Sequence, residues 1–108
     1  MLRDNRSLSL AAPKHLDAPE RDLWERLIRS FALDDPGSRE LLLQACEARM
    51  RARLAREIIL KEGCTYRDDR KNLKAHPAVA MERSAQASFL SAMRLLKLDL
   101  AGTEKRDD

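Results

Sequence analysis

The chain has 108 residues, enough for one small domain, and 36% of them are charged. Because 21 basic residues stand against 18 acidic ones, the formal net charge is only +3, too small for strong non-specific DNA binding unless the basic side chains cluster or several copies pool them. The three glycines cannot form a phosphate-binding P-loop or a dinucleotide fingerprint, and such a low number disfavours an all-β domain.

The first predicted helix follows an N-terminal segment, residues 1–16, that lacks helical periodicity and that we expect to be a flexible arm. Asp17 and Glu20 have the spacing of a capping box, in which each side chain binds a backbone N–H at the start of a helix. Apolar residues then recur at helical spacing, namely Leu23, Trp24, Leu27, Ile28 and Phe31. We expect this helix to end near position 32 or 33.

A turn rich in Asp, Pro and Gly separates the first helix from a longer second one. Asp35 or Ser38 caps the second helix, because both side chains suit an N-cap. No proline or glycine interrupts it before Gly63, so it runs to about Lys61 or Glu62.

The second helix carries apolar residues on two opposite sides. One stripe consists of Leu41, Ala45, Ala48, Ala52, Ala55 and Ile59. The other consists of Leu43, Cys46, Met50, Leu54 and Ile58. Either this helix is sandwiched within its own domain or one stripe meets a second copy of the chain. With only three helices available to cover it, we favour a homo-oligomer.

Beyond the second helix the pattern changes. Residues 64–66 and 73–75 flank a polar stretch and predict a small β-hairpin or an extended loop. His76 precedes Pro77, which disfavours helical backbone at His76, and Pro77 opens a third helix that runs to about Lys97.

The expected architecture is all-α. Three helices form one domain over residues 17–100, with the hairpin or loop between the second and third helices, and a polar tail follows over residues 101–108. The apolar stripe of the third helix consists of Ala78, Ala85, Phe89, Ala92, Met93 and Leu96. Its far side carries small residues, which either let another helix approach closely or simply form an exposed face. The residues predicted to contact a second copy are Leu43, Met50, Leu54, Ile58, Ala80, Ser84, Ala87 and Ser91.

Basic side chains cluster in two places that are candidates for contact with DNA phosphates. On one edge of the second helix these are Arg49, Arg53 and Arg56, and in the hairpin or loop they are Arg67, Arg70, Lys71 and Lys74, beside Tyr66. A solvated helix with ordinary salt bridges, and a loop whose aspartates pair with its basic residues, explain the same pattern. A third interpretation is that the basic edge meets the acidic edge of a neighbouring copy, formed by Glu40, Glu47 and Glu62.

The sequence offers no clear catalytic or metal site. Cys46, Cys64, His15 and His76 lack the spacing of metal ligands, and the acidic pairs lie in turns and polar segments. A nucleophilic pair of Cys64 and His76 is the one alternative, but a histidine before a helix-opening proline is more typical of a cap or a packing residue. We therefore expect no enzymatic activity, no metal and no cofactor.

The polar start and the absence of a long apolar run predict neither a signal peptide nor a membrane span. We expect a cytoplasmic protein with both thiols reduced.

Several motifs occur in a specific order. They are Pro13-Lys14-His15-Leu16, an acidic-capped helix bearing Trp24, Ile58-Ile59-Leu60-Lys61-Glu62-Gly63, His76-Pro77-Ala78-Val79, and Glu82-Arg83-x-Ala85-x-x-x-Phe89-Leu90 leading to Leu95-Leu96-Lys97-Leu98-Asp99. In this order and spacing, over roughly residues 13–100, the chain resembles the small subunit of tailed-phage terminases, of the type often found in prophages. It departs from the family pattern at Lys97, where relatives usually have glycine, and at Leu100, where proline is common.

The resemblance implies a non-catalytic protein of DNA packaging. Such subunits bind the phage genome near its packaging start, present it to a large subunit that carries the ATPase and the nuclease, and commonly assemble as rings. The expected partners are therefore double-stranded phage DNA, the large subunit and further copies of the same chain, in the cytoplasm of a bacterial host.

Two other classes stay open. A helical module that binds only protein would show no salt-sensitive affinity for DNA. A small DNA-binding regulator would need a short recognition helix after a tight turn, and the long second helix argues against it.

Overall fold

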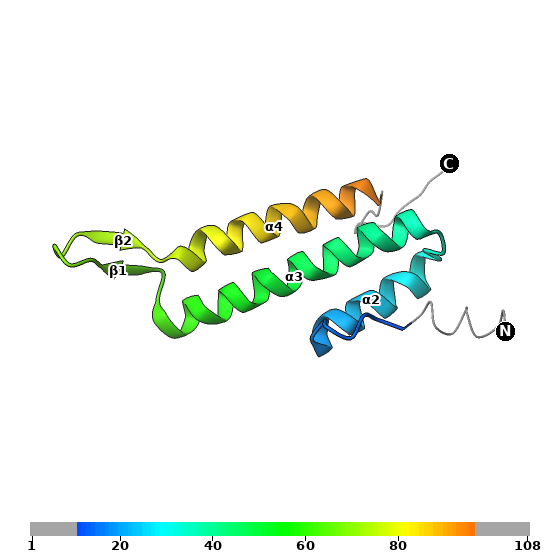
Figure 1. The fold of residues 1–108 in the computed structure, drawn as a ribbon, viewed down its shortest axis with the longest axis horizontal. Coiled ribbons are helices and arrows are strands. Elements are labelled where there is room, and N and C mark those ends of the chain that lie inside the picture. Colours follow the sequence, from blue (N-terminus) through cyan, green and yellow to red (C-terminus); the bar gives the residue numbers. More distant parts are fainter. Residues whose placement is uncertain (1–10, 97–108) are drawn as a thin grey trace.

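The described part of the chain consists of three helices and one β-hairpin, in the order α2, α3, β1, β2 and α4 (Figure 1). The computed structural model describes residues 11–96. The elements are α2 (Ala18–Phe31), α3 (Pro36–Glu62), β1 (Thr65–Arg67), β2 (Leu73–Ala75) and α4 (Pro77–Leu95). The predicted all-α domain with a small hairpin between its second and third helices is confirmed.

Some predictions fall outside the described residues. These are most of the N-terminal arm, the expected end of the third helix at Lys97, and the polar tail over residues 101–108. None of the described helices is both long and apolar enough to cross a membrane.

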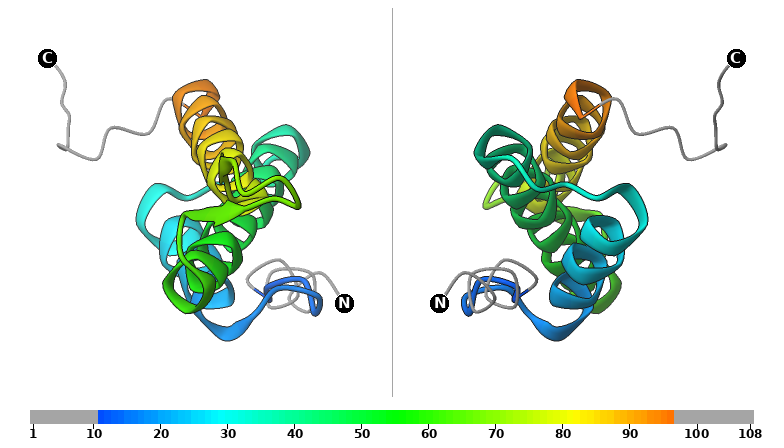
Figure 2. Two further views of the ribbon diagram at one scale, coloured as in Figure 1. Left: turned by 90° about the vertical axis from the view of Figure 1, so that its left-hand side faces the viewer. Right: turned by 90° about the vertical axis from the view of Figure 1, so that its right-hand side faces the viewer.

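The central element of the fold is α3. α4 runs back along one side of it, and α2 packs against another side (Figures 1 and 2). Because α2 has 14 residues and α3 has 27, α2 covers only the first half of α3 (Figure 1). Arg53 of α3 still reaches the start of α2, and beyond it α4 is the neighbouring helix of α3 among the described elements.

Small side chains form the contact between α3 and α4. The buried alanines are Ala45, Ala48, Ala52 and Ala55 of α3 with Ala78, Ala85 and Ala92 of α4. Since the distance between packed helices depends on the side chains at the contact, alanines let the two helices lie close together. The alanine-rich stripe of the second predicted helix therefore faces α4.

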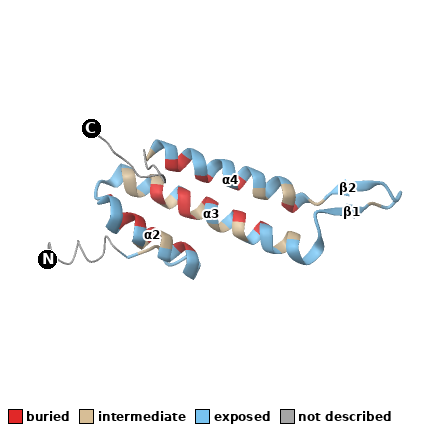
Figure 3. Ribbon diagram, turned by 180° about the vertical axis from the view of Figure 1, so that it is seen from behind, coloured by how far each residue is buried: buried red, intermediate tan, exposed pale blue. Residues whose placement is uncertain are grey.

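The larger core side chains gather where α2, the first half of α3 and the second half of α4 meet (Figure 3). They include Leu16, Trp24, Leu27, Ile28, Leu42, Cys46, Phe89 and Met93. Cys46 is fully buried, and Leu43 and Met50 pack against this core from the same stripe. Over its first half, the second apolar stripe of α3 is thus covered by the chain itself. Phe31, the last residue of α2, stays 43% exposed.

The helix ends follow the sequence signals, with one exception. Asp35 caps α3, because its Oδ2 accepts a hydrogen bond from the Ser38 backbone N–H at 2.9 Å, and this donor lowers the pKa of Asp35. Gly63 ends α3 with φ +89°, a backbone conformation that favours glycine. The capping box predicted for α2 is wrong: Asp17 is the N-cap residue, but its side chain makes no capping hydrogen bond, because it binds α3 instead, as Glu20 also does.

We predict that Ala48→Leu lowers the free energy of unfolding by about 1–3 kcal/mol. Ala48 is fully buried on the face that packs against α4, so the larger side chain forces the helices apart. Chemical denaturation measures the change. Ala18→Leu, at an exposed position of α2, is the matched control and should change stability by less than about 0.5 kcal/mol. Equal effects of the two substitutions would contradict close packing.

Candidate nucleic-acid interface

Arg53, one of the three arginines predicted to face DNA, is enclosed by carboxylates. Its Nε and Nη2 donate to the two carboxylate oxygens of Glu20 at 2.9 and 3.0 Å. Nη2 also donates to Asp17 at 2.6 Å, and Nη1 donates to Glu57 at 2.9 Å. These hydrogen bonds, those to Glu20 first, raise the pKa of Arg53 above its ordinary value. The side chain therefore ties α2 to α3 through a forked pair with Glu20, which is only 2% exposed.

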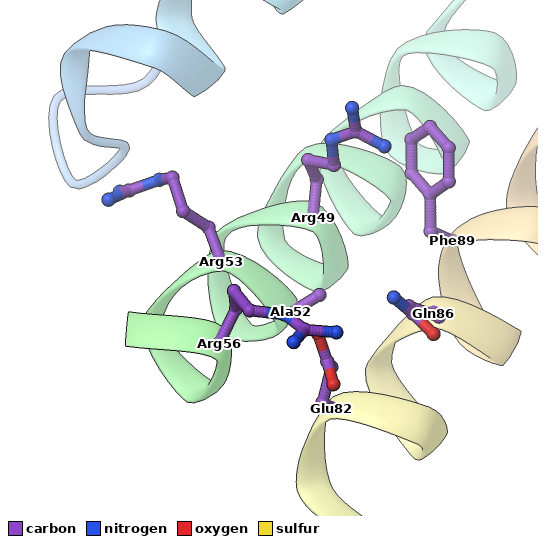
Figure 4. A pocket seen from close by; sticks show the side chains of 7 residues that line it. All are labelled: Arg49, Ala52, Arg53, Arg56, Glu82, Gln86 and Phe89. Carbon is purple, nitrogen blue, oxygen red and sulfur yellow. The ribbon is translucent and has the colours of Figure 1, made fainter. Parts of the chain in front are cut away.

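The other two arginines of this edge lie at a hollow of about 390 Å³ between α3 and α4 (Figure 4). The Arg49 guanidinium stands 5.0 Å from the centre of the Phe89 ring, a cation–π contact. Arg56 donates from Nε to Glu82 at 2.7 Å. Arg53 also lines the hollow, but its guanidinium is directed towards α2 (Figure 4).

This edge of α3 carries no surplus of positive charge. Its three arginines lie among four carboxylates, those of Asp17, Glu20, Glu57 and Glu82. A long polyanion would therefore meet as much negative as positive charge there, well within one Debye length, which is about 8 Å at physiological salt. Contact of Arg49, Arg53 and Arg56 with DNA stays a prediction, and the pairing of two of them within the chain argues against it.

The second predicted cluster lies on the hairpin, which projects from the end of the α3–α4 pair, away from α2 (Figures 1 and 2). The strands pair antiparallel, with Tyr66 opposite Lys74 and Arg67 opposite Leu73. Every residue of both strands is exposed. Arg67, Lys74 and Tyr66 are therefore presented to solvent on a narrow two-stranded ribbon.

Asp68 organises the turn between the strands. Its Oδ1 accepts hydrogen bonds from the backbone N–H groups of Arg70 and Asn72, both at 2.9 Å. Asp68 thus satisfies the backbone, as short polar side chains commonly do in turns, and the salt bridging expected for it is not seen. Over residues 11–96, none of the four hairpin cations forms a salt bridge. Arg67 donates only to the backbone carbonyl of Lys71, at 3.0 Å.

The residues predicted to contact a second copy lie on two sides of the molecule. On α3, Leu43 and Met50 contact the chain's own core, Leu54 is 41% exposed and Ile58 is half-buried. On the outer face of α4 lie Ala80, Ser84, Ala87 and Ser91, all exposed. The sequence reasoning missed two large apolar neighbours of these small residues, Leu90 at 51% and Leu95 at 66% exposed. Neither leucine belongs to the apolar stripe of the third helix. A large apolar residue outside that stripe is the feature of the sequence that could have indicated them.

His76 is the N-cap of α4, as the sequence favoured. Its Nδ1 accepts a hydrogen bond from the Ala78 backbone N–H at 3.0 Å, and its Nε2 lies 2.7 Å from Glu62 Oε1. Both ring nitrogens are therefore engaged, which leaves no free base for the exposed Cys64 thiol. Burial raises the pKa of the other thiol, Cys46, to about 12. No group of three or more potential metal ligands occurs within the described range.

Comparison with known proteins identifies one family. Residues 21–105 match the sequence profile of the family described as phage terminase, small subunit. No curated protein and no solved structure matches the chain significantly.

We predict that Arg53→Met lowers the free energy of unfolding by about 2 kcal/mol, because it leaves the Glu20 carboxylate buried without its cation. The expected change in free energy is smaller than for a fully buried ion pair, since the Arg53 side chain is 29% exposed. Denaturation at constant pH measures it. Arg51→Met, at an exposed position of the same helix, is the control and should be nearly neutral. If Arg53→Met lowers the free energy of unfolding no more than Arg51→Met does, a structural role of Arg53 is contradicted.

Proposed function

The chain belongs to the phage terminase small subunit family, and we propose that it binds phage DNA through its β-hairpin and presents it to the large subunit. Membership implies a role in phage DNA packaging. In this proposal the chain itself catalyses no reaction, acts in the cytoplasm of the bacterial host and leaves the ATPase and nuclease steps to the large subunit.

The observation that carries the proposal is the charge of the hairpin, whose four cations form no salt bridge with any residue in the range 11–96. Four cations stand against two aspartates, and the Asp68 carboxylate is already bound to backbone N–H groups. A two-stranded β-ribbon fits the major groove of B-DNA, and basic side chains on it reach the phosphates on either side. The exposed Tyr66 adds a ring to the same surface.

Several copies would strengthen this binding, because each chain contributes only +3. α2 covers only the first half of α3 (Figure 1), and Leu54 of α3 is 41% exposed. The small residues of α4 are exposed, and three of them, Ser84, Ala87 and Ser91, line a hollow of about 370 Å³ together with Gln44 of α3. Two different contact surfaces, one on α3 and one on α4, favour head-to-tail association, which generates a ring when the rotation closes.

The combined variant Arg70→Gln, Lys71→Gln and Lys74→Gln tests the DNA contact. We expect weaker binding to a DNA duplex and a slope of log affinity against log salt reduced by about 3, one phosphate contact for each removed cation. Fluorescence anisotropy over a salt series measures both quantities.

The matched control removes the same charge elsewhere, through Arg21→Gln, Arg29→Gln and Arg51→Gln, all at exposed helical positions. In this control variant the slope of log affinity against log salt should stay close to that of the unaltered chain. If both variants behave alike, charge alone acts and the hairpin has no specific role. If the unaltered chain shows no salt-sensitive DNA affinity at all, a module that binds only protein becomes the better description.

Leu54→Glu tests the association of copies. A charge on this apolar surface should raise the dissociation constant of the oligomer at least about tenfold, as measured by light scattering over a concentration series. Leu60→Glu, at a more exposed position outside the predicted contact, is the control and should leave the mass unchanged. An unaltered chain that is monomeric at micromolar concentration would rule out the ring.

A further inference from the structure

We propose that His76 and Glu62 are positioning residues that fix the direction in which the hairpin projects. This inference rests on the proposed function of the hairpin in DNA binding, and it adds a device that holds the binding element in place.

The hairpin has little packing support within the described residues. All residues of β1 and β2 are exposed, and the main contacts of each strand are with the other strand. An isolated two-stranded hairpin is only marginally stable in water. Its orientation relative to the helices therefore depends on its base, where α3 ends at Glu62 and α4 begins after His76.

Three hydrogen bonds of His76 meet at this base. The backbone N–H of His76 donates to the Cys64 carbonyl at 2.8 Å and closes the first pair of the hairpin. Nδ1 accepts from the Ala78 backbone N–H and caps α4. Nε2 lies 2.7 Å from Glu62 Oε1, at the last residue of α3.

Only one protonation state of the ring satisfies both side-chain contacts. Because Nδ1 accepts a hydrogen bond, the proton of the neutral imidazole must be on Nε2, from which it donates to the Glu62 carboxylate. The ring is mostly buried, with 18% of its side chain exposed, so it links the two helix ends in a defined orientation. A second proton on Nδ1 would remove the cap.

The geometry makes this link sensitive for DNA binding. The turn of the hairpin lies about 20 Å along the strand from His76, so a rotation of about 10° at the base moves the tip by about 3 Å. A displacement of that size breaks a phosphate contact. A hairpin fixed in its binding orientation also loses less conformational freedom when DNA binds, which favours affinity.

Two variants of Glu62 separate this tether from charge. Glu62→Gln and Glu62→Ala remove the same negative charge, but the glutamine oxygen still accepts from Nε2–H and alanine does not. We expect Glu62→Ala to bind a DNA duplex about fivefold more weakly than Glu62→Gln. Both should unfold at similar denaturant concentrations, because Glu62 is half-exposed at the end of a helix.

Two variants of His76 separate the tether from the cap. His76→Asn keeps a short acceptor for the Ala78 N–H but does not reach Glu62, so it should retain stability and lose affinity as Glu62→Ala does. His76→Ala should lose both. The ¹⁵N chemical shifts of the His76 ring provide an independent measurement. In the unaltered chain and in Glu62→Gln they should show a protonated Nε2 that donates to an acceptor. In Glu62→Ala the shift of Nε2 should change.

Equal DNA affinities of Glu62→Ala and Glu62→Gln, with His76→Asn binding like the unaltered chain, would overturn the positioning role. If the hairpin charge variant still weakens DNA binding in that case, the proposed function stands and this inference alone fails. If the hairpin charge variant binds normally, the proposed function fails, and the positioning role fails with it.

Discussion

The close approach of α3 and α4 is the constraint on which the rest of the structure depends. Alanines line the contact from both helices, so the two helices lie close enough for the last residue of one and the N-cap of the other to share a hydrogen bond. That closure determines where the hairpin leaves the helical body. The same approach places Phe89 beneath Arg49 and Glu82 beside Arg56. The helix contact therefore shapes both surfaces that were candidates for DNA binding.

Pairing within the chain favours one of those two surfaces as the contact with DNA. Arg53 binds three carboxylates and holds α2 against α3, which turns a basic helix edge into a balanced one. The hairpin keeps its cations free of carboxylates over the described residues and presents them beyond the helical body. For a protein of the terminase small subunit family, whose role involves DNA, the hairpin is the better-supported contact. A low net charge per chain fits this division, because the edge of α3 is balanced in charge and the hairpin holds a local excess of cations.

Local signals made the elements predictable. The signals that set the helix ends act over only a few positions. They are the prolines at the first turns of all three helices, Gly63 at the end of α3 and the helical spacing of apolar residues. The helix starts and the end of α3 were therefore predictable. The pairing of Asp17 and Glu20 with Arg53 was not predictable, because it spans more than thirty positions and competes with a sound local alternative, the capping box. The basic hairpin was visible in the sequence. The sequence did not show that the Asp68 carboxylate binds the backbone of the turn instead of a hairpin cation.

In the proposed function the hairpin, rather than the edge of α3, contacts DNA. Hydrogen–deuterium exchange with mass spectrometry, on the full chain with and without a DNA duplex at low salt, tests it most directly. We expect DNA to slow exchange in the peptide covering residues 65–75 and to leave exchange in the peptide covering residues 49–57 unchanged. Slowed exchange confined to residues 49–57, with the hairpin unaffected, would contradict it.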